Sequence, residues 1–468
     1  MSPLYFPTLS LCFLLFLSLR PLLPAAEPIE ARLLDEWKDP DFIKSFTGDL
    51  GVRTDIEPSI SAEEQALIAS ILPQITQNQA QAYSSLSAKV TTHSSAALDF
   101  LLGHLSNVSG NREQAARHYN VATDKFPNFL RAHKWLGHFY FEQQDFVQAT
   151  QSYGRVLSLN GGDEFVHGRL AYCLLSRGEY VSAETAFRNA SVTNPSNPRW
   201  KTGLAHCYLN LGQSEAALAI TEELLRQEPD TQSHWLLKAN AHLAADEARK
   251  ALAALEAARR VGRATAEILI SIGDLYLNEG LIISAVENYQ AALSENPNAA
   301  EVGTLRAIEA LLTRNQLAAA RTVLGSYNEL NSTQATEAIK ERREKLRLWI
   351  NLSSDDSSDA VSDMESYLTN HPLDIDSLVR LADHLQATDN TIRAEQLYLQ
   401  ALRIDATKAP VLVKLAQLQA QQRRYAEALL TVQKAIRLNN DPNLESYAQQ
   451  LDLLAKREAD ESPSPSVR

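Results

Sequence analysis

Small and large apolar residues recur at steps of three and four between residues 266 and 299, which is the spacing of one face of an α-helix. Gly280 divides this stretch into two helical patterns at the place where a turn is needed. Pro297 follows the second pattern and closes it. The stretch therefore predicts two helices joined by a turn, in a unit of 34 residues.

The same unit recurs six times in unbroken phase between residues 96 and 299. Its eighth position is always small, at Gly103, Gly137, Ala171, Ala205, Ala239 and Gly273. The twentieth is always alanine, at Ala115, Ala149, Ala183, Ala217, Ala251 and Ala285. The twenty-fourth is mostly large, at Tyr119, Tyr153, Phe187, Thr221, Leu255 and Tyr289. Small residues let two helices approach closely, so we expect these positions to form the packed interior.

The pattern weakens towards both ends of the chain. A degenerate unit begins after Ser61, which is spaced with Glu64 as a capping box. Residues 334–340 break the phase by seven residues, and we expect this insertion to lengthen a helix. The predicted organisation is a lead-in at 27–61, an array at 62–299 whose first repeat is degenerate, a weak repeat plus insertion at 300–340, a second array at 341–442, a capping helix at 443–459 and a disordered tail at 460–468.

These landmarks resemble the tetratricopeptide repeat, a helix–turn–helix unit that stacks into arrays. The resemblance implies an all-α fold, a right-handed superhelical α-solenoid of about ten to eleven repeats. It also implies a scaffold that binds a protein or peptide and has no chemistry of its own. Because no repeat buries its own apolar face, we expect the stability of the array to be a sum over neighbouring repeats.

Residues 1–26 are typical of an export signal. The apolar run Leu9–Leu19 has the length of a signal core and is too short to span a bilayer. Small residues at Pro24, Ala25 and Ala26 suit cleavage before Glu27, although no Lys or Arg precedes the apolar run. We therefore predict an exported protein of the periplasm or cell envelope, with an uncleaved anchor as the alternative.

Composition and motifs exclude several functional classes. The net charge of −13 disfavours general nucleic-acid binding, and we expect only indirect membrane association. The sequence has no Gly-rich phosphate loop, HExxH, GxSxG or paired-cysteine motif, and residues 353–359 lack the glycine and glutamate of a calcium loop. We predict no enzymatic activity, no cofactor, no metal site and no small-molecule substrate.

Two cysteines remain after cleavage of the predicted signal, Cys173 and Cys207. Both occupy the tenth position of their units, one repeat apart. Equivalent Cα atoms in packed helices lie roughly 9–10 Å apart, which is beyond the reach of a disulfide. We expect two buried thiols.

The candidate binding site is the inner, concave face. In tetratricopeptide arrays the first helix of each unit lines this face at positions two, five, nine, twelve and thirteen. Upstream of residue 210 these positions are basic and aromatic, and such side chains are enriched at binding hot spots. We predict that they bind a protein or peptide with an acidic segment through Phe100, His104, Arg131, Lys134, His138, Phe141, Tyr172, Arg199 and His206. The alternative interpretation, a set of solvated or hydrogen-bonded surface side chains, stays open.

Some arrays of this family hold a terminal carboxylate with Lys at position five and Asn at position nine. Only Lys134 matches that arrangement here, so we do not expect a carboxylate clamp. Under the adaptor hypothesis, charge reversal at Arg131 and Lys134 abolishes partner capture without loss of the fold.

Two functions are compatible with these features, an exported adaptor and a self-assembling structural component of an envelope complex. The stretches 41–49, 94–104 and 126–137 resemble exported bacterial repeat proteins, some of which occur beside TonB–ExbB–ExbD-type systems. The resemblance implies a partner in outer-membrane energisation or transport. A monomer in light scattering at high concentration would exclude self-assembly.

Overall fold

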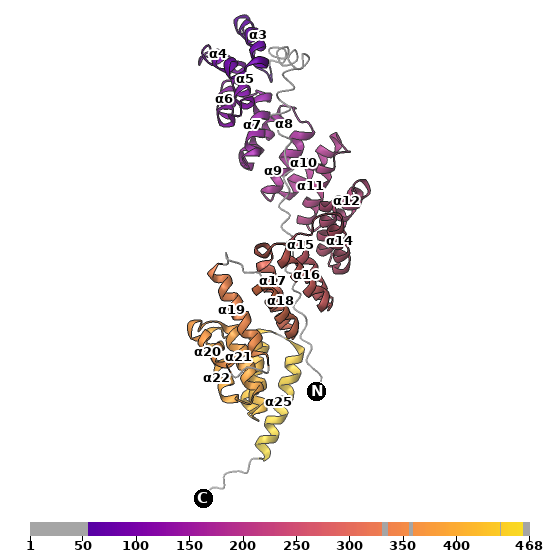
Figure 1. Ribbon diagram of the computed structural model, residues 1–468, viewed down its shortest axis with the longest axis vertical. Helices are drawn as coiled ribbons and strands as arrows, with labels where there is room; N and C mark the ends of the chain where they lie inside the picture. Colours follow the sequence, from indigo (N-terminus) through magenta and orange to yellow (C-terminus); the bar gives the residue numbers. More distant parts are fainter. Residues whose placement is uncertain (1–54, 330–335, 355–358, 440, 462–468) are drawn as a thin grey trace. The chain divides into compact units, whose positions relative to one another are not determined.

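The computed structural model describes residues 55–329, 336–354, 359–439 and 441–461 (Figure 1). Several predicted segments lie wholly or partly outside the described residues. They are the export signal, the lead-in up to residue 54, residues 334–335 of the insertion, residues 355–358 of the acidic run, and the tail from residue 462. Contacts divide the chain into two compact units between Ala264 and Thr265. We call them the first unit and the second unit and describe each by itself.

The described residues form an all-α solenoid of 23 helices, α3 to α25, with no strand among them. They make eleven helix pairs and one terminal helix, as the 34-residue period predicts. The first unit contains α3 (Ala62–Gln77), α4 (Gln79–Ser87), α5 (Ala96–Val108), α6 (Arg112–Lys125), α7 (Leu130–Glu142), α8 (Phe146–Ser158), α9 (Glu164–Ser176), α10 (Tyr180–Thr193), α11 (Pro198–Asn210), α12 (Ser214–Gln227), α13 (Gln232–Ala244) and α14 (Ala248–Val261).

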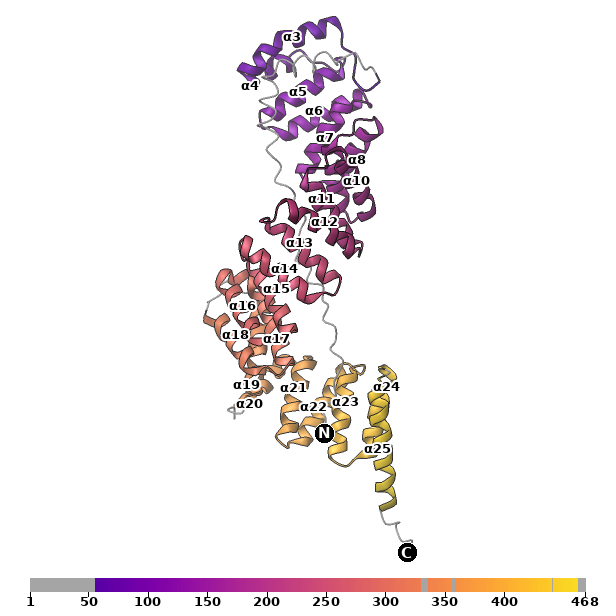
Figure 2. The ribbon, with the colours of Figure 1, turned by 90° about the vertical axis from the view of Figure 1, so that its right-hand side faces the viewer.

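The second unit continues the same alternation of first and second helices (Figure 2). It contains α15 (Ala266–Asn278), α16 (Ile282–Glu295), α17 (Pro297–Thr313), α18 (Leu317–Glu329), α19 (Glu337–Leu352), α20 (Ala360–Asn370), α21 (Ile375–Ala387), α22 (Thr391–Ile404), α23 (Ala409–Gln421), α24 (Tyr425–Leu438) and α25 (Pro442–Glu461). The terminal helix α25 packs on α24 and extends two residues into the segment predicted to be a disordered tail.

The turn between the two helices of a repeat depends on one left-handed residue. Gly280 has φ 77° in the second unit, and Gly110, Gly178 and Gly212 have the same sign of φ in the first. A glycine adopts this conformation without the steric cost that a Cβ atom brings. Gln144 and Arg423 occupy the same turn position at φ 59° and 65°, so glycine is favoured at this position but not required.

The predicted interior positions are buried. Every residue that we assigned to positions eight, twenty and twenty-four is buried. A Cβ atom added to Gly137 would lie 2.7 Å from the Tyr153 ring, and one added to Gly273 would lie 2.6 Å from the Tyr289 ring. The small residue at position eight therefore makes room for the large ring at position twenty-four, as the close-packing argument requires.

The insertion lengthens a helix, as predicted. Helix α19 has 16 residues and begins at Glu337, whereas α15 has 13 residues. The degenerate first repeat also starts as expected, because the Ser61 hydroxyl accepts from the Glu64 N–H and the Glu64 carboxylate accepts from the Ser61 N–H.

Candidate functional site

The predicted binding residues lie on the first helices α5, α7, α9 and α11 of the first unit. Helix α7 packs on α9, and α9 packs on α11, so these helices form one continuous face. We call it the inner face. Its first helices are positioned by the second helices behind them, whose small residues allow the close approach described above.

Four of the predicted residues lie in the packed interior and have little surface to offer a partner. Phe100 and His104 are each 1% exposed, Tyr172 is 4% exposed and Phe141 is 6% exposed. The Phe100 ring lies 5.4 Å from the Tyr119 ring and 5.0 Å from the Phe129 ring, measured between centroids. These side chains fill the space between successive repeats, because a large ring at position five or nine gains more contact area there than at the surface.

Three histidines of this face are held in the neutral state. Burial, with a smaller contribution from the charge of Arg131, lowers the pKa of His104 to about 3. Burial also lowers the pKa of His206 to about 4. Burial and the charges of Arg169 and Lys134 hold the pKa of His138 well below its usual value. At neutral pH these three side chains therefore add no positive charge to the inner face.

The predicted cations Arg131 and Lys134 already have acidic partners within the chain. Arg131 Nε donates to both carboxylate oxygens of Glu57 at 3.0 Å, and Arg131 Nη2 donates to one of them at 2.7 Å. Lys134 Nζ donates to the Asp163 carboxylate at 2.5 Å. The predicted charge reversal at these two positions would thus break intramolecular ion pairs, so it cannot separate partner binding from folding.

The segment from Asp55 to Pro58 lies against the start of α7. The Leu130 N–H donates to the Ile56 carbonyl at 3.1 Å, and the Asn128 side chain donates to the Asp55 carbonyl at 3.3 Å. Ile56 is 7% exposed and Glu57 is 5% exposed. A segment without helical structure therefore seats an acidic side chain on this surface through backbone hydrogen bonds and a bidentate ion pair.

The accessible part of the predicted site lies further along the face. Arg199 is exposed at the start of α11, and His206 is half-buried on the same helix. Phe165 on α9 is 36% exposed, and its ring stands edge-on to Trp200 at a centroid distance of 6.3 Å. This region combines a solvent-facing cation with a partly exposed aromatic ring.

A polar relay between successive repeats was not predicted from the sequence. In the second unit, the Tyr289 hydroxyl donates to Asp274 at 2.9 Å, and Arg306 of the next repeat donates to the same carboxylate at 2.5 Å. The Asp383 carboxylate likewise accepts from Tyr398 and from Lys414, each at 2.6 Å. The relay joins the tyrosine at position twenty-four to an acceptor at position nine and to a cation of the next first helix.

In the first unit, His138 takes the place of the carboxylate as a neutral acceptor in this relay. The Tyr153 hydroxyl lies 2.7 Å from His138 Nδ1, and Arg169 Nη1 lies 2.5 Å from the same nitrogen. Since Arg169 can only donate, His138 Nδ1 is the acceptor. The sequence signal for the relay is the recurrence of tyrosine fifteen residues after a polar residue, at 138 and 153, 274 and 289, and 383 and 398.

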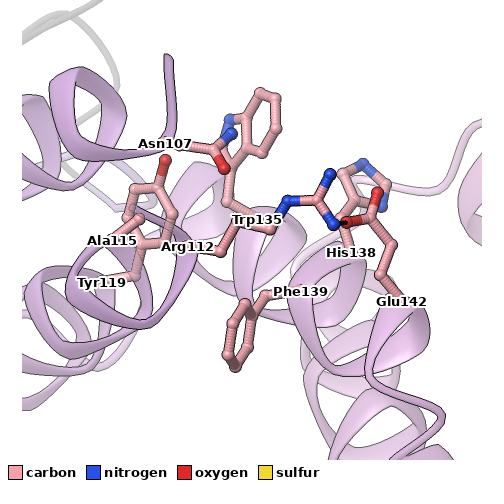
Figure 3. Close-up of a pocket in the computed structure, with 8 residues that line it drawn as sticks. All are labelled: Asn107, Arg112, Ala115, Tyr119, Trp135, His138, Phe139 and Glu142. Atoms are coloured by element: carbon pink, nitrogen blue, oxygen red, sulfur yellow. Dashed lines mark ion pairs between the residues drawn. The ribbon is translucent and has the colours of Figure 1, made fainter. Parts of the chain in front are cut away.

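The first full repeat departs from the relay and leaves a small pocket. Its position-nine residue is His104, and the cation of the next helix is replaced by Trp135, which lies edge-on to His104 at 5.2 Å. The Tyr119 hydroxyl is buried and has no hydrogen-bond partner among the described residues. Figure 3 shows this tyrosine beside a pocket of about 20 Å³, lined by Asn107, Arg112, Ala115, Tyr119, Trp135, His138, Phe139 and Glu142.

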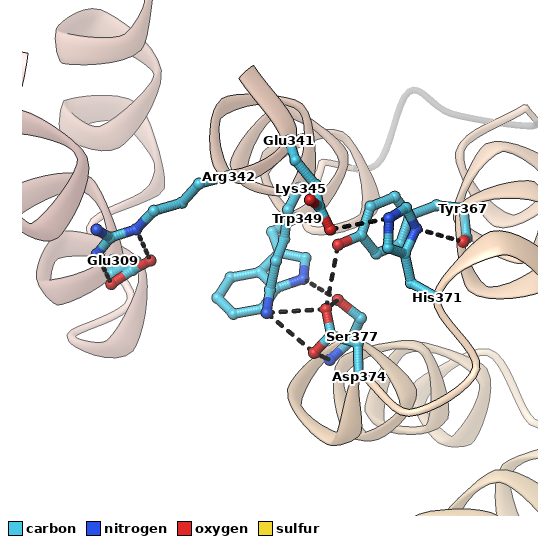
Figure 4. A network of polar contacts seen from close by, with 9 residues as sticks. All are labelled: Glu309, Glu341, Arg342, Lys345, Trp349, Tyr367, His371, Asp374 and Ser377. Atoms are coloured by element: carbon cyan, nitrogen blue, oxygen red, sulfur yellow. Dashed lines mark hydrogen bonds and ion pairs between the residues drawn. The ribbon is translucent and has the colours of Figure 1, made fainter. Parts of the chain in front are cut away.

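A second polar cluster lies in the second unit, around α19 (Figure 4). Trp349 lies beneath two cations, with Lys345 Nζ 4.7 Å and Arg380 Cζ 4.3 Å from the centroid of its ring. Lys345 also pairs with Asp374 at 2.8 Å. A neighbouring cleft of about 590 Å³ contains paired charges, among them the bidentate Arg342–Glu309 pair. Because these charges compensate one another, we interpret the cluster as a structural contact between repeats.

The two cysteines are free and buried, as predicted. Burial raises the pKa of both thiols to about 12, so they are protonated at neutral pH. Across the described part of the chain, no group of three or more His, Cys, Asp or Glu side chains is placed to hold a metal ion. No helix in the described ranges combines the length and the apolar character needed to cross a membrane.

Family models agree with this architecture. Family models of the tetratricopeptide repeat match residues 108–164, 174–241 and 236–300. No curated protein matches the sequence. Similar solved structures include YrrB, described as a TPR protein with an unusual peptide-binding site, at 16% identity over 40% of this chain and 95% of that chain, with a TM-score of 0.37.

Two further structures illustrate the range of these similarities. A tetratricopeptide repeat protein from Parabacteroides merdae is 17% identical over 52% of this chain and 98% of that chain, with a TM-score of 0.36. A structure of Naa15/Naa10 bound to HypK-THB is 17% identical over 84% of this chain and 66% of that chain, with a TM-score of 0.37.

Proposed function

Because this chain is a tetratricopeptide repeat protein, a scaffold suited to protein or peptide binding, we propose that it is an exported adaptor that holds its partner on the inner face of the first unit. Tetratricopeptide repeat proteins are generally non-enzymatic scaffolds, and the proposal assigns this chain no catalysis. The partner is a protein or a peptide with an acidic segment, and nucleic acids are not among its ligands.

The observation that carries the proposal is the way in which Glu57 sits on Arg131. A short irregular segment of the chain itself binds there, with a backbone hydrogen bond to Leu130 and a bidentate carboxylate. The surface is thus suited to an extended acidic segment. Since Arg131 is already paired, the proposed contacts of an external partner lie further along, at Phe165, Arg199 and His206.

A charge reversal at an accessible position tests the proposed site. Arg199→Glu on α11 should weaken binding of acidic peptides by about tenfold, because an attraction between opposite charges is replaced by repulsion between like charges. Arg226→Glu on α12 is the matched control, since Arg226 is an exposed arginine on a second helix. Binding of peptides from a randomised 12-residue library would be measured for the purified chain and both variants.

Two results would contradict the proposed site. One is equal peptide affinity for Arg199→Glu and Arg226→Glu, and the other is the failure of every peptide to bind the parent chain. Circular dichroism and the melting temperature would establish that both variants keep the fold.

Export is a separate part of the proposal. Its support is the apolar run Leu9–Leu19 followed by small residues before Glu27. A fusion of residues 1–26 to an alkaline phosphatase lacking its own signal should give periplasmic activity, and mass spectrometry of the exported chain should find Glu27 at its N-terminus. Cytoplasmic retention of the fusion would contradict it.

The suggested link to a TonB–ExbB-type system rests only on the resemblance of the stretches 41–49, 94–104 and 126–137 to exported bacterial repeat proteins. Deletion of the gene should then lower TonB-dependent uptake across the outer membrane, and complementation should restore it. Unchanged uptake in the deletion strain would remove this link and leave the adaptor proposal in place.

A further inference from the structure

The position-twenty-four tyrosines provide an internal comparison. In three repeats the hydroxyl donates to a position-nine acceptor, namely His138, Asp274 or Asp383. The Tyr119 hydroxyl is buried to the same degree, with 2% of the residue exposed, and has no such partner in the described part of the chain. A buried hydroxyl without a hydrogen bond costs about 1–3 kcal/mol, so a group that supplies the missing acceptor would bind favourably.

Four of the eight residues that line the pocket beside Tyr119 carry hydrogen-bond donors, and Glu142 adds a carboxylate. Tyr119 contributes a hydroxyl, Trp135 an indole N–H, Arg112 a guanidinium and Asn107 an amide (Figure 3). Such a wall selects an oxygen acceptor. The volume of about 20 Å³ admits the oxygen end of one small group, because a single water needs about 10–15 Å³ measured in the same way.

The charges around the pocket favour a neutral acceptor over a carboxylate. Arg112 Nη1 pairs with the Glu142 carboxylate at 3.2 Å, so its charge is already compensated. A second carboxylate in the pocket would meet Glu142, a like charge, and would lose its own hydration. A carboxamide keeps the acceptor oxygen without this repulsion, and its amino group can donate to a nearby carboxylate.

We propose that the pocket between α5, α6 and α7 binds the side-chain carboxamide of an asparagine or glutamine in a partner peptide, with the Tyr119 hydroxyl donating to its oxygen. This inference rests on the proposed function and extends it, because it names a specificity-determining contact on the inner face. The site lies beside Trp135, whose ring provides a flat apolar surface for the aliphatic part of the partner side chain.

The test uses the full chain and a randomised 12-residue peptide library. Peptides retained by the parent chain should contain an essential Asn or Gln, and its replacement by Asp or Glu should weaken binding by about tenfold, the effect of one hydrogen bond. Tyr119→Phe should cause the same loss of affinity without lowering the melting temperature. Tyr289→Phe is the matched control, because its hydroxyl is paired with Asp274, and it should lower the melting temperature without changing affinity.

The remaining outcomes separate the possible failures. Peptides that bind Tyr119→Phe and the parent chain equally well overturn the carboxamide site and leave the adaptor function standing. If Tyr119→Phe lowers the melting temperature and leaves affinity unchanged, the pocket holds only a resident water and the inference is wrong. If the parent chain retains no peptide at all, the proposed function fails and this inference fails with it.

Discussion

The two units share one packing register but differ in how often an ion pair connects their first helices. In the second unit an ion pair bridges each step from α15 to α23: Asp274–Arg306, Glu309–Arg342, Lys345–Asp374 and Asp383–Lys414. In the first unit aromatic rings dominate two steps, with Phe100 on Phe129 and His104 on Trp135 near α7, and Tyr172 and Phe165 on Trp200 near α11. Between them, the step from α7 to α9 is bridged by the Lys134–Asp163 ion pair.

This difference shows which positions define the fold and which are free to vary. Positions eight, twenty and twenty-four are buried in both units because they set the distance between helices. Position nine carries Asp274 and Asp383 in the second unit, and His104, His138 and His206 in the first. In these repeats the side chain at position nine sets the contact, which is an ion pair at Asp274 and Asp383, a histidine relay at His138 and an aromatic contact at His104. The pairs Glu309–Arg342 and Lys345–Asp374 bridge their repeats from other positions.

The largest expected effect is the loss of a relay carboxylate in the second unit. Asp274→Ala removes the acceptor of both Tyr289 and Arg306, and it leaves the buried tyrosine hydroxyl without a partner. We expect a loss of about 2–3 kcal/mol in the free energy of unfolding, with the contribution of Arg306 reduced because its side chain is 43% exposed. Hydrogen exchange of peptides from residues 265–329 would measure it.

Glu287→Ala provides the control for this prediction, because Glu287 is an exposed carboxylate on the neighbouring helix α16. It should change the free energy of unfolding by less than about 0.5 kcal/mol. Equal effects of the two substitutions would show that the relay does not stabilise the second unit.

The next effect in size is a selective loss of stability in the first unit at low pH. Nine of the eleven histidines precede residue 265, and burial holds the pKa of His104 at about 3 and that of His206 at about 4. In the unfolded chain each of these histidines has a pKa of about 6.5 and binds a proton below that pH, whereas in the folded chain it stays neutral. Stability therefore falls as pH drops below about 6.5, by about 1 kcal/mol per buried histidine between pH 6.5 and 5.5.

Hydrogen exchange at pH 7.5 and 5.5, corrected for intrinsic exchange rates, would compare the two units within one molecule. Protection should fall more in the first unit. His104→Phe keeps an aromatic ring against Trp135 and removes one titrating group, so the loss should become smaller by about 1 kcal/mol. The same decrease of protection in both units would contradict the role assigned to the histidines.

The fold was predictable from the sequence because its determinants repeat. Gly137 and Tyr153 recur at fixed spacing in several units, and the structure confirms that the glycine accommodates the ring. The eleven helix pairs and the lengthened α19 follow from the same phase. Periodic positions can be assigned from the sequence because each repeat tests the assignment made for the others.

The site was less predictable because its determinants do not repeat. The contact of Glu57 with Arg131 joins residues 74 positions apart, and the segment around Glu57 has no helical period. Burial of Phe100 and His104 could not be read from their positions, since a ring at position five or nine can face solvent or fill the space between repeats. The neutral state of the histidines follows from that burial, so the basic character predicted for the inner face was overestimated.

The smallest expected effect is a difference in salt sensitivity between the units. At 1 M NaCl the Debye length is about 3 Å, so partly exposed ion pairs lose most of their attraction, whereas aromatic contacts do not. Such pairs bridge all four steps of the second unit, while in the first unit Lys134–Asp163 bridges one step and aromatic contacts dominate two others. Both side chains of the Arg342–Glu309 pair are about one-third exposed, at 36% and 33%. Such pairs contribute a few tenths of a kcal/mol each, so we expect the second unit to lose about 1 kcal/mol relative to the first.

The double variant Arg342→Met, Glu309→Gln sharpens this comparison, because it replaces one bridging pair by neutral side chains of similar length. Its second unit should respond less to 1 M NaCl than that of the parent chain, by a few tenths of a kcal/mol in hydrogen exchange. Equal salt responses of the two units in the parent chain would contradict this prediction. The bridging pairs would then stabilise the second unit through packing and hydrogen bonding, and not through net Coulombic attraction. The ion pairs and the aromatic contacts would then be interchangeable ways of fixing the same helix spacing.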